Sequence, residues 1–214
     1  DPGYFFDCLT WDYKKNEGWL LADPIQRKLT LFHIKENNYS QIDTAGIPSL
    51  QPNEAFFAAS GSSLLIQNDK FTLVGGGAAL ARIYQKKNLR SAWTSIETKI
   101  QTGEAKGYFS IGAKNRKELW AVGGDYRHLN ENLIPILVTQ DGGETWLELA
   151  DSPKFYMEKV IWAKPYWIVC GPSQSAAFHS TRKLWKNLGP SSYHNIIQVG
   201  NEIWGIGAKG QLGK

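Results

Sequence analysis

A repeat of about fifty residues is the sequence feature that most constrains the fold. Short apolar segments that end in small residues recur along the chain, and their first residues lie 53, 48, 47 and 37 positions apart. They begin at Trp19, Thr72, Trp120, Trp167 and Trp204. A strand-like segment precedes each of them, and a third segment followed by an aromatic residue comes after most of them. The repeating unit is therefore four short strands, with no segment of helical period between them.

Four antiparallel strands repeated every ~40–50 residues are the signature of a β-propeller. A two-sheet sandwich is the rival fold, but it gives no reason for the repeat. The nine Trp, nine Tyr, nine Phe and 21 Gly also favour short strands and tight turns. We predict an all-β chain that forms a β-propeller of four-stranded antiparallel blades. The chain supplies four blades and the first two strands of a fifth.

Repeats of this length suit rings of six to eight blades, so we expect a partial propeller. The chain begins at Asp1 with no Met, and it begins inside a repeat. On this basis residues 1–214 are predicted to form a single propeller domain that lacks its N-terminal blades.

The residues from Thr139 to Trp146 match Ser/Thr-x-Asp-x-Gly-x-Thr-Trp, the pattern of an Asp box. An Asp at the start of a tight turn accepts hydrogen bonds from backbone N–H groups, and Gly supplies a φ that other residues resist. The third unit alone keeps the box; the second has Asn88 where the Asp would stand. We interpret the box as a folding device rather than a site. Its structural residues are Thr139, Asp141, Gly143, Thr145 and Trp146.

Charge and motif content limit the classes of partner. The 24 basic and 20 acidic residues leave a net charge of +4, and no run of Lys and Arg predicts nucleic-acid binding. No apolar stretch approaches the ~20 residues that span a bilayer, so we expect no membrane insertion. Cys8, Cys170 and the four His have no metal-ligand spacing, and no flavin, haem or dinucleotide motif is present. We expect buried free thiols, no metal and no cofactor.

Several segments of the chain resemble a known family. The chain is similar to bacterial Asp-box propellers with BNR-like repeats, which are related to the photosystem II assembly and stability factors and are often labelled "oxidoreductase". The resemblance runs through essentially all 214 residues, and it implies an exported protein, periplasmic or extracellular, that acts as a non-catalytic binding or assembly platform. Besides the Asp box, the segments that carry it are Phe5-Phe6-Asp7, Ala58 to Leu64, Gly75-Gly76-Gly77 with Ala81-Arg82, Gly103-Glu104-Ala105 with Phe109-Ser110, and Val122 to Tyr126.

One departure argues against a photosystem role. The photosynthetic members look richer in Arg on one face of the ring, whereas here Arg82 alone falls inside a matching motif.

Propeller geometry places the candidate site residues together. In a four-stranded meander, the starts of first strands and the ends of second strands lie on the face opposite the Asp box. We expect their side chains to ring the mouth of the central channel and to bind a polar ligand, a peptide terminus or a cation. The alternative is that they hydrogen-bond neighbouring turns and hold the blades together. The candidates are Asp7, Asp23, Ser62, Arg82, Glu104, Ser110, Asp125 and Tyr126.

Two functions of different class follow. We predict a non-catalytic binding or assembly module that takes a protein or peptide partner at the channel-mouth face. The alternative is a carbohydrate-active enzyme or glycan-binding propeller of sialidase-like architecture. Sialidases need three arginines and a Tyr–Glu pair, but only Arg82, with Arg127 as a second candidate, maps to the candidate face. No residue motif supports the oxidoreductase label, and we assign no catalytic residue.

Seven aromatic residues fall into two expected groups. Trp120, Trp146, Trp167 and Trp204 occupy repeat positions, so we expect them to be buried in blade packing. Tyr126, Trp11 and Trp162 are the aromatic residues that we expect to be available as exposed platforms.

Overall fold

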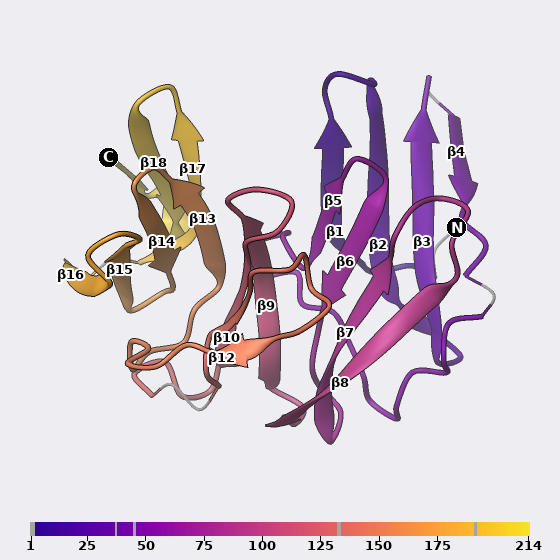
Figure 1. The fold of residues 1–214 in the computed structure, drawn as a ribbon, viewed down its shortest axis with the longest axis horizontal. Coiled ribbons are helices and arrows are strands. Elements are labelled where there is room, and N and C mark those ends of the chain that lie inside the picture. The colour runs from indigo at the N-terminus through magenta and orange to yellow at the C-terminus, as the bar shows by residue number, and fades with distance from the viewer. Residues whose placement is uncertain (1–2, 37, 45, 132–133, 191) are drawn as a thin grey trace. The chain divides into compact units, whose positions relative to one another are not determined.

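The regular secondary structure of the chain is almost entirely β-strand (Figure 1). The computed structural model describes residues 3–36, 38–44, 46–131, 134–190 and 192–214, which contain nineteen strands and one 3-10 helix at Ala208–Gly210. Within these ranges no helix is long and apolar enough to cross a bilayer. The chain divides into two compact units, Asp1–Gly107 and Tyr108–Lys214, and each is described by itself.

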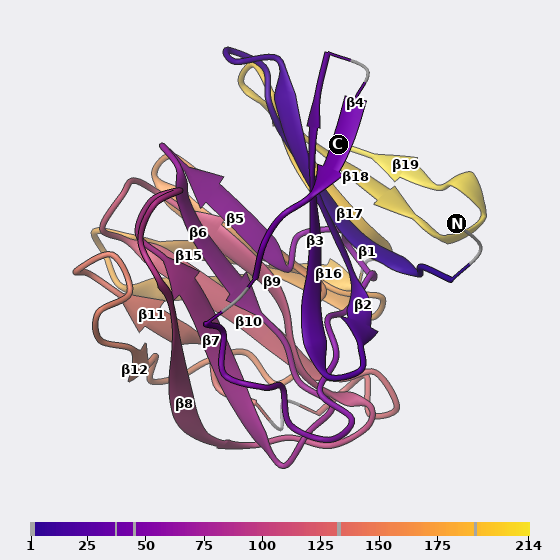
Figure 2. The same ribbon diagram turned by 90° about the vertical axis from the view of Figure 1, so that its right-hand side faces the viewer.

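The first unit contains two four-stranded antiparallel sheets, each with its strands in sequence order. Figures 1 and 2 both show β1 to β4 as adjacent strands of one sheet. The strands of the two sheets are β1 (Phe6–Asp12), β2 (Glu17–Ile25), β3 (Lys28–Lys35), β4 (Asn38–Gln41), β5 (Leu64–Gln67), β6 (Lys70–Val74), β7 (Leu80–Lys86) and β8 (Trp93–Gln101).

The second unit contains three further sheets of the same topology, the last with three strands. Its first strand, β9, begins at the boundary between the units. The strands are β9 (Lys106–Ala113), β10 (Leu119–Asp125), β11 (Leu137–Thr139), β12 (Leu147–Glu148), β13 (Lys159–Ala163), β14 (Tyr166–Cys170), β15 (Gln174–His179), β16 (Leu184–Pro190), β17 (Tyr193–Val199), β18 (Glu202–Gly207) and β19 (Leu212–Gly213).

The fold class is therefore all-β, a β-propeller of five mostly four-stranded blades, as the repeat predicted. In each sequence repeat, the predicted first and second strands overlap observed strands. The fifth blade differs from the prediction of two strands, because a short third strand, β19, pairs with β18 through Gly205 and Gly213.

The core of the first unit is a cluster of aliphatic and aromatic side chains shared by its two sheets. Trp19 and Leu21 alternate along β2 and are 1% and 0% exposed. The Trp19 ring meets Phe71 of the other sheet edge-on at 5.8 Å, and Phe71 contacts Trp93 at the same distance. This interlocking of rings holds the two sheets face to face.

The core of the second unit is centred on a stacked pair of indoles. The ring centroids of Trp120 in β10 and Trp167 in β14 lie 4.7 Å apart, with an interplanar angle of 11°. The Phe178 ring packs against Trp120 with centroids 5.3 Å apart, and Met157 and Val169 belong to the same buried cluster.

The expectation that all four repeat tryptophans are buried is wrong for two of them. Trp120 and Trp167 are 6% and 2% exposed, but Trp146 and Trp204 are only partly buried. Trp146 precedes β12, a strand of two residues whose side chains are exposed, so little of a fourth strand is present to cover its ring.

β-Bulges mark the starts of two first strands. In β1 the pairing with β2 shifts between Phe6 and Cys8, so Asp7 is the extra residue. In β17 the pairing with β18 shifts between Tyr193 and Asn195, which makes His194 the extra residue. A bulge breaks the strict alternation of a strand and re-aims the side chain at that position.

Candidate functional site

The connection after β10 forms a compact loop, residues 125–131, which we call the Tyr126 loop. Asp125 is 9% exposed and shapes the first turn, because its Oδ1 accepts a hydrogen bond from the Arg127 N–H at 2.9 Å. The Asp125 carbonyl accepts a second bond, from the His128 N–H at 2.9 Å. The carboxylate also lies 3.2 Å from His128 Nδ1. An Asx turn of this kind fixes the backbone locally.

The same loop is anchored to the neighbouring blade. The Leu129 carbonyl accepts hydrogen bonds from the Tyr156 N–H at 3.0 Å and from Ser173 Oγ at 3.1 Å. Gly124, with φ +151°, permits this approach, since a Cβ there would lie 3.0 Å from Tyr156 Cα. The loop is thus held at Asp125 and at Leu129 by backbone and side-chain hydrogen bonds.

What the loop presents outward is aromatic and apolar. Tyr126 is 45% exposed and Leu129 38% exposed. The Tyr126 ring packs against Phe109 in a T-shaped contact, with ring centroids 6.4 Å apart at 85°, and the Arg127 guanidinium carbon lies 5.8 Å from the Tyr126 ring centre. A large amphipathic side chain is therefore exposed on a rigid base.

A hydrogen-bonded carboxylate lies close to the base of this loop. Glu158 is 6% exposed, accepts a hydrogen bond from the Tyr156 hydroxyl, and lies 2.7 Å from Nδ1 of His194. Burial raises the pKa of Tyr156 well above its ordinary value, and Glu158 adds to the rise. Burial likewise raises the pKa of the Cys170 thiol to about 12, so this thiol stays protonated.

Ser110 of the second unit has a structural contact. It is 0% exposed, and its Oγ accepts a hydrogen bond from the Val160 N–H at 3.1 Å. This contact ties the first strands of two adjacent blades together. Glu158, the residue before β13, makes a similar link to His194 of β17. These two contacts are of the kind expected if polar residues at the strand starts hold the blades together, which was the alternative to ligand binding.

In the first unit the structure brings Asp7 and Asp23 close enough to interact. Asp7 is 4% exposed, and its Oδ2 has no hydrogen-bond partner among the described residues. Burial raises the pKa of Asp7 to about 8, with the charge of Asp23 as a second cause. Asp23 is half-buried, and burial also raises its pKa. The Asp23 N–H donates to the Phe5 carbonyl at 2.9 Å.

Arg82 belongs to a separate ion-pair network of the same unit. Its guanidinium lies 3.7 Å from Glu54 and 3.6 Å from Glu97, and it donates to the Tyr84 hydroxyl at 3.4 Å. The Tyr84 hydroxyl in turn donates to Glu54 at 2.8 Å, and the Gln51 N–H donates to the same carboxylate at 2.7 Å. These groups satisfy one another, which is the pattern of a structural network.

The remaining two candidates of the first unit lie in loops. Ser62 is 8% exposed, and its Oγ is 2.6 Å from Ser60 Oγ. Glu104 is exposed in the tight turn closed by the Lys106 N–H and the Gly103 carbonyl at 2.9 Å. The eight candidates thus divide into five in the first unit and three in the second. Their gathering round one channel mouth stays a prediction.

The Asp-box turn makes a closed set of hydrogen bonds. Both Asp141 oxygens accept the Thr145 N–H, at 3.0 and 3.1 Å, and Oδ2 also accepts the Thr145 hydroxyl at 2.6 Å. Thr139 Oγ1 donates to Asp141 at 2.7 Å and accepts the Gly143 N–H at 2.8 Å. These bonds hold the pKa of Asp141 below its usual range. The Trp146 indole N–H donates to the Gly143 carbonyl at 3.1 Å.

The three consecutive glycines mark close backbone crossings. A Cβ on Gly75 would lie 2.5 Å from the Ala55 carbonyl, and one on Gly76 would lie 2.5 Å from the Gly107 Cα. Gly77 has φ +81°, in the left-handed region. Strand β7 follows them, and the run allows these backbones to pack closely.

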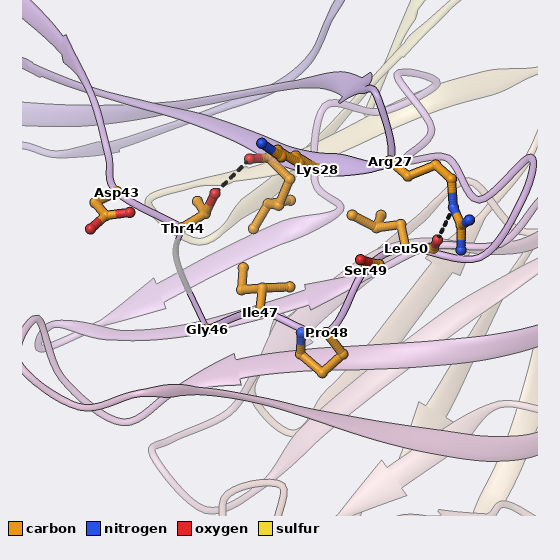
Figure 3. A pocket seen from close by; sticks show the side chains of 10 residues that line it. Arg27, Lys28, Asp43, Thr44, Gly46, Ile47, Pro48, Ser49 and Leu50 are labelled. Atoms are coloured by element: carbon orange, nitrogen blue, oxygen red, sulfur yellow. Dashed lines mark hydrogen bonds between the residues drawn. The ribbon is translucent and has the colours of Figure 1, made fainter.

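A pocket of about 320 Å³ under the 43–50 loop was not indicated by any sequence signal (Figure 3). Ile47, Pro48 and Leu50 line it, with Arg27 and Asp43 on opposite sides of the view. Ala45 of this loop lies outside the described residues. Arg27 Nε donates to the Leu50 carbonyl at 2.7 Å, so this arginine holds the loop in place.

The part of the chain that the structure describes contains no group of three or more His, Cys, Asp or Glu side chains placed to hold a metal ion.

Comparison with known proteins identifies the fold and no family. No protein-family model matches the chain, and no curated protein does. Among solved structures, the GH74 enzyme of Niastella koreensis is similar with a TM-score of 0.64 and 14% identity, over 88% of this chain and 31% of that one. The Pan2 WD40 domain of Neurospora crassa is similar with a TM-score of 0.60 and 12% identity, over 98% of this chain and 58% of that one.

The extracellular domain of BT4673 from B. thetaiotaomicron gives a TM-score of 0.51 and 11% identity, over 95% of this chain and 31% of that one. The chain therefore spans about a third of the length of two of these proteins and somewhat over half of the third. At such identities the likeness concerns the propeller fold alone.

Proposed function

We propose that the chain is a non-catalytic binding or assembly module that recognises a protein or peptide through the Tyr126 loop. The observation that carries the proposal is the exposed Tyr126 ring seated on Phe109. Tyrosine is enriched at the energetic centres of protein interfaces because it offers a large, rigid, amphipathic surface.

The anchoring of the loop supports the same function. Binding costs free energy when a loop must be ordered, and a loop that is already fixed avoids most of that cost. The Tyr126 loop is fixed by the Asp125 turn at one end and by the two hydrogen bonds to the Leu129 carbonyl further along. A partner that places an apolar side chain against Tyr126 and Leu129 therefore fits this surface.

The proposal extends to the type of propeller and to its location in the cell. We infer that the chain is an exported Asp-box propeller, periplasmic or extracellular, akin to the photosystem II assembly factor-like group. The matching motifs and the closed Asp-box turn at Thr139 to Trp146 support this inference. Cell fractionation that places the native full-length protein in the cytoplasm would contradict the location.

The test of binding is a capture experiment with matched variants. Tyr126→Ala removes the exposed ring, and Tyr166→Ala removes a tyrosine of the same unit that is 36% exposed. Extract of the source organism is passed over each immobilised protein, and the bound proteins are quantified by mass spectrometry. A partner recovered by the parent chain and by Tyr166→Ala should fall at least tenfold on Tyr126→Ala, since truncating a central interface residue costs about 2 kcal/mol or more.

Equal recovery by the two variants would show that the Tyr126 loop is not the binding surface. A glycan array run in parallel separates the competing proposal, a carbohydrate-active or glycan-binding propeller. Sugar binding that Tyr126→Ala abolishes, without any protein partner, would replace the protein-binding function with the glycan one.

A further inference from the structure

Asp7 and Asp23 form an acidic pair in the first unit that the proposed function does not use. Asp7 is the bulge residue of β1, and Asp23 lies in β2. We propose that this pair binds one primary alkylammonium group, such as the side chain of a lysine. The proposal concerns the first unit alone and does not depend on the Tyr126 loop.

The unpartnered oxygen of Asp7 points to a missing donor. The large majority of buried side-chain polar atoms in proteins have a hydrogen-bond partner, and an unpaired one carries a cost in free energy. Asp7 is 4% exposed, yet its Oδ2 has no partner among the described residues. The neighbouring Cys8 thiol donates instead to the Gly61 carbonyl at 2.8 Å, so it does not supply the donor.

The chemistry of the pair favours an ammonium over a metal ion. Calcium takes six to eight oxygen ligands and magnesium requires a near-octahedral set. Within the described residues no third acidic, His or Cys ligand joins the pair. An ammonium group has three N–H donors and is satisfied by two carboxylates and one further acceptor.

The surroundings of Asp23 favour an alkyl stem on that ammonium. Asp23 is half-buried, and its N–H donates a hydrogen bond to the carbonyl of Phe5. The Phe5 side chain is 61% exposed. A stem of several methylenes can lie along such a ring while its charged head reaches the carboxylates.

Binding at this pair is coupled to a proton. Below the pKa of about 8 Asp7 carries a proton, and Asp23 is the charged group acting on it. An incoming ammonium displaces that proton: neutral Asp7 and the cation become an ion pair plus one released H⁺, so charge balances. Each unit of pH below this pKa changes the ionised fraction about tenfold, so the apparent affinity should rise about tenfold between pH 6 and pH 7.

The experiment is isothermal titration of n-butylammonium chloride into the intact chain. Two buffers of different ionisation enthalpy, neither of them a primary amine, give the number of protons released. We expect saturable binding with close to one proton released at neutral pH. Asp7→Asn should weaken binding at least about tenfold and abolish the proton release. Asp43→Asn, at an exposed Asp of the same unit, should change neither.

Ligand controls and a second variant make the outcome decisive. n-Butanol has the same stem without the charge and should not bind, and calcium chloride should not compete. Asp23→Asn, which leaves the buried Asp7 in place, should also weaken binding and covers the case in which Asp7→Asn does not fold. Absence of butylammonium binding, equal binding by Asp7→Asn, or tighter binding of calcium would each overturn the proposal and leave Asp7 as a buried structural acid.

Discussion

Burial of the Asp7 carboxyl links the stability of the chain to pH. The pKa of Asp7 is about 8 in the folded chain, raised from 3.8 by burial first and by the charge of Asp23 second. Between these two values the folded state holds a proton that the unfolded state has lost. The contribution of Asp7 is therefore fully present below about pH 4 and is lost as the pH rises towards 8.

The corresponding prediction is a stability profile. Urea denaturation between about pH 5 and about pH 9 should give a free energy of unfolding that falls as pH rises to about 8 and then levels off. Asp7→Asn removes the titrating group and should flatten this part of the profile. If the free energy of unfolding had the same pH dependence in the parent chain and in Asp7→Asn, the slope could not be assigned to Asp7.

Two tryptophans of the second unit should respond differently to truncation. Trp167→Ala removes a side chain that is 2% exposed and stacked on Trp120, and should cost about 3–5 kcal/mol. Trp146→Ala removes a partly exposed ring and should cost within the ordinary range of about 0.5–3 kcal/mol. Chemical denaturation measures both, and a larger cost at Trp146 would contradict the packing described.

At the scale of single elements, the run of glycines shows why some small residues cannot be enlarged. Gly76 of the first unit pairs with Gly107 in an isolated bridge, and the two backbones lie closer than any side chain permits. Gly103, in contrast, has open space where a Cβ would stand. The sequence pattern alone does not distinguish these two glycines.

Substitution separates them. Gly76→Ala should destabilise the chain by about 1–3 kcal/mol, because the backbone must move apart to accept the methyl group. Gly103→Ala should stay within about 0.5 kcal/mol of the parent. The difference between the two variants in thermal or urea unfolding is the measurement, and equal values would show that the crossing is not tight.

The strands could be predicted from the sequence, while the polar contacts at their ends could not. Alternating apolar residues and recurring tryptophans fix strand position because side chains of period two must face a core. The bulges at Asp7 and His194 insert one residue into that period, so their orientation follows from backbone pairing that no pattern shows. The Glu158–His194 contact joins residues 36 positions apart in different blades and was missed for the same reason.

The candidate residues show a similar division. Their positions at strand ends followed from the meander, but which of them are satisfied internally depends on neighbours brought in by the fold. Arg82 is engaged by Glu54, Glu97 and Tyr84, whereas one oxygen of Asp7 has no partner in the described part of the chain. The sequence holds no signal for this difference.

At the scale of the whole molecule, the two compact units each have a core of their own. The first is centred on Trp19, Phe71 and Trp93, and the second on Trp120 and Trp167. Each core is built from side chains of its own unit. Local opening should therefore follow the unit in which packing is weakened.

Hydrogen exchange followed by mass spectrometry tests this division. Trp167→Ala should raise exchange in strands of Tyr108–Lys214 more than in strands of Asp1–Gly107, and Leu73→Ala, at a residue that is 0% exposed, should do the reverse. A uniform rise across both units in either variant would show that the chain opens as one cooperative body.

The turn that closes the second blade has a wider consequence. There Asn88 accepts hydrogen bonds from the Arg90 and Ser91 N–H groups, both at 2.9 Å, much as Asp141 accepts those of Thr145. The Asn88 amide oxygen thus accepts backbone hydrogen bonds as the Asp141 carboxylate does, although the two turns differ in sequence. A search that counts Asp boxes to count blades would find one box in this chain, whereas the backbone forms five blades. Blade number in diverged propellers is better counted from strand rhythm than from the motif.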